Sequence, residues 1–127
     1  MQLKKLDSFI TRRKAIYNKY SEAFSKLDWI EPPPVVNFEN KSSYYFFWIQ
    51  TNYRDKLARY LLSNEIYTTF RYWPLHKIKL FKEFNIEGKY PNTDYIASHT
   101  LNIPLHQGLS DDDVQKIIKL IVDFKVD

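Results

Sequence analysis

The sequence predicts an α+β domain in which a small, largely antiparallel sheet has helices packed on one face. Three observations lead to this fold class. A long stretch with helical hydrophobic spacing opens the chain, short β-branched and aromatic runs follow near 44–50 and 66–70, and a second amphipathic stretch closes it. Because 127 residues is about the length of one domain, we expect a single unit over residues 1–127.

The first element is predicted as an amphipathic helix over residues 3–27. Its apolar stripe recurs at spacings of three and four residues, with one break at Arg13, and comprises Leu3, Leu6, Ile10, Tyr17, Tyr20, Phe24 and Leu27. The opposite face is basic, with Lys4, Lys5, Arg12, Arg13, Lys14 and Lys19. Such a face fits either a solvated helix surface, which we favour, or a contact with nucleic acid.

A strand–helix–strand unit is predicted over residues 43–70, after the helix-breaking run Pro32-Pro33-Pro34. Its first strand is apolar on both alternating faces and therefore needs cover on both sides. Either this strand is buried in the chain's own core, or its second aromatic face meets something outside the chain. Leu57 and Leu61 mark the helix, and the run 66–70 has the β-type residues of a second strand.

Three further helices are predicted. A short one holds Ile78 and Phe81 and extends to Phe84, and another runs from a cap at Asn92 or Thr93 to about Leu101. The closing helix is predicted over 111–124. Ser110 precedes three aspartates at its start, and its buried stripe comprises Val114, Ile117, Ile118 and Ile121.

Composition excludes several classes of function. With two glycines, Gly88 and Gly108, the chain has no glycine-rich phosphate loop, and with no cysteine it has no thiol nucleophile or Cys-liganded metal. The excess of 19 basic over 15 acidic residues is too mild to establish nucleic-acid binding. Neither a signal-peptide core nor an apolar run of membrane-spanning length is present, so we expect a cytoplasmic location without membrane insertion.

The titratable residues do not form a recognisable catalytic or metal-binding motif. His76, His99 and His106 are far apart in sequence, and none belongs to a zinc-binding pair. The three consecutive aspartates point in different directions around a helix and suit its positive end. We therefore expect neither a catalytic residue nor a metal site in this chain.

The densest group of polar and aromatic residues spans 70–76, where the second strand is expected to end. Arg71 can form two parallel hydrogen bonds with a phosphate or carboxylate, and the neighbouring rings of Tyr72 and Trp73 can stack on a base or a sugar. The alternative is that Arg71 is an ordinary surface charge beside core aromatics.

Several blocks, in this order and spacing, resemble the C-terminal small domain of the DegT/DnrJ/EryC1/StrS sugar aminotransferases. They are Gln2-Leu3-Lys4-Lys5-Leu6-Asp7 with Arg12-Arg13, Ser42-Ser43-Tyr44-Tyr45-Phe46, Arg54-Asp55-Lys56-Leu57, Ile66-Tyr67-Thr68-Thr69 with Tyr72-Trp73-Pro74-Leu75-His76, and Asn102-Ile103-Pro104-Leu105-His106-Gln107-Gly108-Leu109 followed by Ser110-Asp111-Asp112-Asp113-Val114.

This resemblance implies part of a pyridoxal-phosphate (PLP) enzyme that moves an amino group from a donor such as glutamate to a keto sugar nucleotide. Such enzymes act in cell-surface polysaccharide or antibiotic-sugar synthesis. In the family, the cofactor-binding lysine and most cofactor contacts lie in a large N-terminal domain that these 127 residues do not contain. The resemblance thus implies that the chain binds no PLP and is inactive by itself, and that the full-length protein is a homodimer.

The resemblance also points to substrate-binding positions at Arg71, Tyr72 and His76. Many relatives carry histidine at the position of Arg71, and a fixed cation there suits a diphosphate or carboxylate better than proton transfer. Tyr45 stands where relatives often carry histidine, and we interpret it as a packing residue. The alternative function is a free-standing module that binds nucleic acid or another protein.

Overall fold

The computed structural model describes residues 2–34, 42–82 and 88–126. In chain order its elements are η1 (Gln2–Lys5, a 3-10 turn), α1 (Leu6–Phe24), β1 (Phe47–Gln50), α2 (Arg54–Ser63), η2 (Leu75–Lys77, a second 3-10 turn), α3 (Lys79–Lys82), α4 (Pro91–His99), β2 (Thr100–Ile103) and α5 (Asp111–Val122). Phe84, which was expected to extend a short helix, lies outside the described residues.

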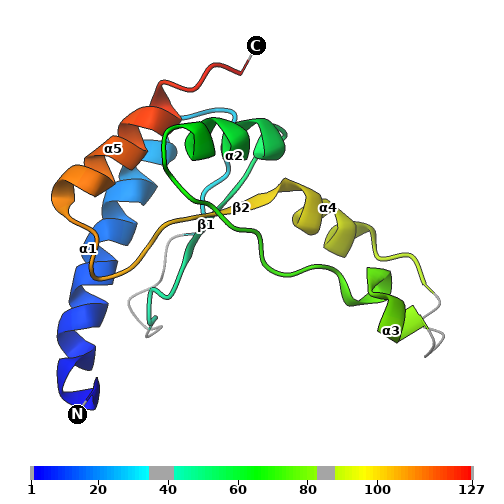
Figure 1. Ribbon diagram of the computed structural model, residues 1–127, viewed down its shortest axis with the longest axis horizontal. Coiled ribbons are helices and arrows are strands. Elements are labelled where there is room, and N and C mark those ends of the chain that lie inside the picture. Colours follow the sequence, from blue (N-terminus) through cyan, green and yellow to red (C-terminus); the bar gives the residue numbers. More distant parts are fainter. Residues whose placement is uncertain (1, 35–41, 83–87, 127) are drawn as a thin grey trace.

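The sheet has two antiparallel strands, with Phe47 opposite Ile103 and Gln50 opposite Thr100. Helices α1 and α5 lie side by side, and α2 contacts both α5 and β2 (Figure 1). These three helices cover one face of the sheet. The predicted fold class, an α+β domain with a small antiparallel sheet, is confirmed.

The core forms between that covered face and the three helices. The Phe47 ring lies at its centre, with ring-centroid distances of 4.9 Å to Tyr17, 5.3 Å to Tyr20 and 5.9 Å to Phe24. The buried apolar residues are Ile16, Tyr17, Tyr20, Phe24, Ile30, Phe47, Ile49, Leu57, Leu61, Leu101, Ile103, Leu105, Val114, Ile117, Ile121 and Phe124. On each strand these residues alternate with those of the other face, as strand geometry requires.

The start of α5 matches the sequence prediction. The Ser110 hydroxyl accepts a hydrogen bond from the Asp113 N–H at 3.1 Å, and the Asp113 carboxylate accepts one from the Ser110 N–H at 3.0 Å. These reciprocal bonds satisfy backbone donors that the helix leaves open. The Ser110 hydroxyl, which donates to the Asp113 carboxylate at 2.6 Å, and the Ser110 N–H lower the pKa of the Asp113 carboxyl. The helix ends at Val122 rather than 124, although Phe124 still reaches the core.

Helix α1 ends at Phe24, three residues before the predicted end, and part of its basic face makes contacts within the chain. Arg12 and Lys19 donate to the Asp111 carboxylate at 3.0 and 2.8 Å, and Arg13 donates to the Ser43 carbonyl at 3.0 Å. The two cations lower the pKa of Asp111. Half of the six basic residues thus tie α1 to other segments, which reduces the charge available to an external polyanion.

The prediction of a second strand at 66–70 is wrong. Within that run only Thr69 pairs with the sheet, as an isolated antiparallel bridge to Asn102. The second strand is instead Thr100–Ile103, where the α4 helix was expected to continue. β1 is also shorter than predicted, because the segment before Phe47 has no ladder partner among the described residues. The residues around 66–70 have suitable propensity, but strand pairing requires a partner, and the chain departs from the sheet after Thr69.

The cap of α4 differs from the prediction. α4 begins with Pro91 at its first position and Tyr90 as its cap, rather than at Asn92 or Thr93. Proline suits that position because the missing N–H would have no partner within the helix. Residues 73–82 and 88–99, which we call the arm, project away from the sheet (Figure 1). At the arm's base, the Arg54 guanidinium donates to the carbonyl of Ala97.

The end of α2 yields a stability prediction at Glu65. The N–H groups of Glu65 and Ile66 donate to the carbonyls of Leu62 and Leu61 at 3.0 and 2.9 Å, and Glu65 has a φ of 66°. This is the Schellman arrangement, in which glycine avoids the strain that a side chain introduces. Glu65→Gly should raise the free energy of unfolding by about 0.5–1 kcal/mol in urea denaturation. Glu65→Ala, which keeps the strain, should not raise it.

A second stability prediction concerns Thr100 at the start of β2. Its side chain is 8% exposed, and its hydroxyl has no hydrogen-bond partner among the described residues. Removing an unsatisfied buried hydroxyl while keeping the β-branched shape is favourable. Thr100→Val should therefore increase the free energy of unfolding by about 1 kcal/mol. A lower thermal midpoint for Thr100→Val would show that the hydroxyl has a stabilising partner.

Candidate functional site

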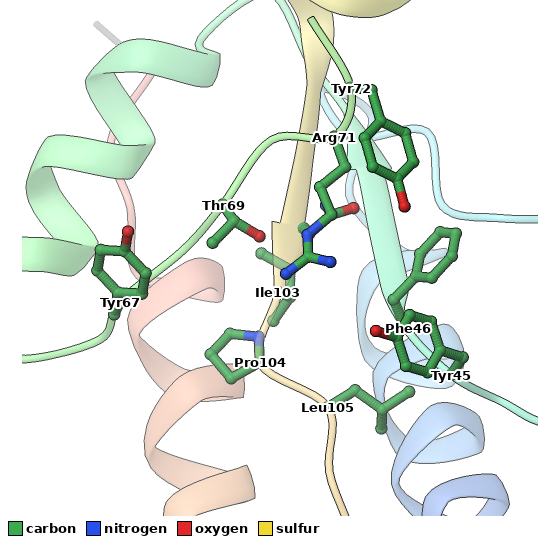
Figure 2. Close-up of a pocket in the computed structure, with 10 residues that line it drawn as sticks. Tyr45, Phe46, Tyr67, Thr69, Arg71, Tyr72, Ile103, Pro104 and Leu105 are labelled. Carbon is green, nitrogen blue, oxygen red and sulfur yellow. The ribbon is translucent and has the colours of Figure 1, made fainter.

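A cavity of about 280 Å³ lies beside the strands and the segment that includes Thr69 (Figure 2). The residues that line it are Tyr45, Phe46, Tyr67, Thr69, Arg71, Tyr72, Asn102, Ile103, Pro104 and Leu105. They come from three segments that are distant in sequence: the approach to β1, the segment before the arm, and β2 with the residues that follow it.

The bridge between Thr69 and Asn102 explains why these segments form one wall. Their backbones exchange two hydrogen bonds, of 2.6 and 3.3 Å, so the segment around Thr69 lies along the free edge of β2. In an extended chain, alternate residues face the same side. Tyr67, Thr69 and Arg71 all line the cavity at this spacing.

Arg71 extends into the cavity between Thr69 and the rings of Tyr45 and Phe46 (Figure 2). None of the ion pairs found in the described parts of the chain involves its guanidinium. The surrounding rings are unusually open for aromatic side chains, since Tyr72 is 80% exposed and Tyr45 is 64% exposed. An unpaired guanidinium among exposed rings is suited to an anionic ligand that carries a ring.

His76 does not line this cavity, so the structure divides the predicted cluster. Its Nε2 atom lies 3.0 Å from the Asp94 carboxylate, and its ring centroid lies 4.9 Å from that of Tyr90. Lys77 also contacts Asp94, at 2.7 Å, and these partners lower the pKa of Asp94. His76 therefore joins two parts of the arm, whereas Arg71 and Tyr72 share the cavity.

Sequence reasoning missed several residues of the cavity. Tyr45 was interpreted as a packing residue, but it belongs to the exposed rim. The resemblance to the family includes Asn102 only as a member of a longer block. The signal that could have identified it is the alternation of Thr100 and Asn102 with the apolar Leu101 and Ile103. That alternation is typical of a strand with two different faces.

The cavity does not have the residues of a PLP-binding site. A PLP enzyme uses a lysine to bind the cofactor and an acidic or basic partner at its pyridine nitrogen. The described lining includes no lysine and no carboxylate, and its one cation, Arg71, lies among rings that suit a substrate. Nor do the described parts of the chain group three His, Cys, Asp or Glu side chains in a way that could hold a metal ion.

No helix among the described residues is both long and apolar enough to cross a bilayer.

Comparisons with known proteins identify the class to which this domain belongs. The solved aminotransferase TlmJ from Streptoalloteichus hindustanus is 39% identical, with a TM-score of 0.88, over 94% of this chain and 32% of TlmJ. The Streptococcus pneumoniae protein Spr1654 in its PMP form is 25% identical, with a TM-score of 0.85, over 94% of this chain and 31% of its own. The fold is thus that of part of a PLP-dependent aminotransferase.

The model of the DegT/DnrJ/EryC1/StrS aminotransferase family matches residues 1–122, and the chain belongs to this family. Among curated proteins, the dTDP-4-dehydro-2,3,6-trideoxy-D-glucose 4-aminotransferase of Saccharopolyspora spinosa is 35% identical over 119 residues. That match covers 92% of this chain and 30% of the relative. The chain therefore spans about a third of the length of the curated relatives it matches.

Proposed function

We propose that the chain is the C-terminal small domain of a PLP-dependent sugar aminotransferase and forms the substrate side of its active site. The full-length protein would transfer an amino group from an amino acid such as glutamate to a keto sugar nucleotide, in the synthesis of a cell-surface polysaccharide or an antibiotic sugar. Family membership and the relatives that aminate nucleotide-linked sugars support this proposal.

The observation that carries the proposal is the unpaired Arg71 guanidinium in an aromatic cavity. A sugar nucleotide combines a diphosphate with rings that aromatic side chains can cover. Arg71 can donate two parallel hydrogen bonds to phosphate oxygens, and Tyr72 can cover a ring of the substrate. The chain's residues thus bind and orient the substrate and exclude water from it.

The PLP that completes the site would be held by the large domain and would serve as the electron sink for amino transfer. Supporting this division, the cavity wall offers no lysine or carboxylate among the described residues. We therefore propose that the chain alone is inactive, and that the full-length protein is a cytoplasmic homodimer. His76 would act on the substrate only indirectly, by holding two parts of the arm together through Asp94.

A chimera tests this function. Residues 1–127 would replace the matching segment of the Saccharopolyspora spinosa 4-aminotransferase, with the relative's large domain kept intact. We expect the chimera to bind PLP and to transfer an amino group from glutamate to a keto sugar nucleotide, whereas residues 1–127 alone should do neither. A folded, PLP-loaded chimera that is inactive with nucleotide-linked keto sugars would contradict the proposal.

A further inference from the structure

The side chain of Asn102 is an unexplained polar group in the wall of the cavity. The residue is 7% exposed, and its backbone N–H and carbonyl are both bonded to Thr69. In the parts of the chain that the structure describes, its side-chain amide makes no hydrogen bond, although the residue lines the cavity.

Among the described residues, Thr100 Oγ1 is the only fully buried side-chain polar atom without a hydrogen-bond partner, so the Asn102 carboxamide is open to the cavity that it lines. A ligand that enters the cavity can replace water as the hydrogen-bond partner of this amide. Asn102 has both a carbonyl oxygen that accepts and an NH₂ group that donates. A ligand group that itself donates and accepts would satisfy it.

Thr69 supplies a second polar group beside Asn102. The two residues are directly opposed across the antiparallel bridge, where side chains of a pair lie on the same face and about 4.5–5.5 Å apart at Cβ. Figure 2 shows the Thr69 side chain next to the Arg71 guanidinium, at the same cavity. The wall therefore presents a hydroxyl and a carboxamide side by side, close to a cation.

We propose that Asn102, together with Thr69, hydrogen-bonds neighbouring hydroxyl groups of the hexose in a sugar nucleotide whose diphosphate contacts Arg71. This inference rests on the proposed function and deepens it by dividing the cavity into an anion position and a sugar position. Adjacent hydroxyls on a sugar ring each donate and accept, which matches the two groups of the wall. Exposed rings such as Tyr67 and Tyr72 can cover the apolar face of the sugar.

Isothermal titration calorimetry of dTDP-glucose and of dTDP with the PLP-loaded chimera tests whether the cavity has separate anion and sugar positions. Asn102→Ala should raise the Kd for dTDP-glucose about tenfold and change the Kd for dTDP by less than about twofold, because dTDP lacks the hexose. Asn102→Leu, which is similar in size but makes no hydrogen bond, should have the same effect, and Asn102→Ser should have a smaller one. Arg71→Ala should weaken both ligands.

Thr100→Val is the matched control, since Thr100 is equally buried on the same strand but does not line the cavity. It should leave both Kd values unchanged, and the thermal midpoint of each variant reports whether its fold is intact. Equal weakening of dTDP and dTDP-glucose by Asn102→Ala would mean that Asn102 contacts the nucleotide, and no weakening would mean that it contacts no ligand. Either result overturns the sugar contact, whereas loss of the Arg71 effect on dTDP would count against the proposed function itself.

Discussion

Replacing Phe47 by alanine is expected to remove about 3–5 kcal/mol from the free energy of unfolding. Phe47 is fully buried, and its ring contacts three aromatic rings of α1 at centroid distances of 4.9, 5.3 and 5.9 Å. The truncation loses buried apolar area and leaves a cavity at the junction of α1 with the sheet. A domain of this size has a net stability of about 5–15 kcal/mol, so much of it would be lost.

Urea denaturation followed by circular dichroism measures this effect, and the neighbouring phenylalanine is a matched control. Phe46 is 50% exposed on the rim of the cavity, so Phe46→Ala should cost less than about 1 kcal/mol. The milder Phe47→Leu, which should cost less than about 1.5 kcal/mol, keeps the comparison possible if Phe47→Ala does not fold. Equal losses at positions 46 and 47 would contradict the burial of Phe47 in the core and the exposure of Phe46 beside the cavity.

Replacing Arg71 by alanine is expected to raise the KM of the chimera for the sugar nucleotide about 10- to 100-fold and to change the KM for glutamate much less. A charge-assisted hydrogen bond contributes about 1.5–3 kcal/mol, which corresponds to this range. Arg71 has no ion-pair partner in the described structure, so its removal should affect ligand binding more than folding. Steady-state kinetics with each substrate varied in turn measures both constants.

Two variants sharpen this test. Arg71→Lys keeps the charge but not the planar guanidinium, so it should recover only part of the affinity. Arg59→Ala removes an exposed arginine from α2, away from the cavity, and should leave both KM values unchanged. Equal increases in KM for glutamate and for the sugar nucleotide after Arg71→Ala would argue against a diphosphate contact.

The elements that could be predicted from sequence are those whose determinants are local. Helix α5 begins at Ser110 because the bonds that satisfy its first turn come from Ser110 and Asp113, three residues apart. The hydrophobic period of α1 likewise sets the face that it buries. The strand Thr100–Ile103 has only four residues and exists because β1 and Thr69 pair with its two edges, so a local pattern did not reveal it.

For the candidate site, too, the sequence predicted only groupings of residues that are close together in the chain. Arg71 and Tyr72 are adjacent in sequence, and both line the cavity, so the structure keeps this part of the predicted cluster together. His76 was grouped with them by proximity along the chain, but the 3-10 turn at Leu75–Lys77 carries it into the arm, where it contacts Asp94. Asn102 is about thirty residues from Arg71 and reaches the same cavity only through its bridge to Thr69.

The sequence by itself determined the fold class, the amphipathic helices, the absence of glycine-rich and cysteine chemistry, and the resemblance that led to the family. These properties depend on composition, on periodicity within one segment and on the order of short motifs. Only the tertiary structure decided which segment completes the sheet, which basic residues of α1 are used internally, and which polar groups share the cavity with Arg71. Those outcomes depend on backbone hydrogen bonds and side-chain packing between segments that are far apart in the chain, and no local pattern specifies such pairings.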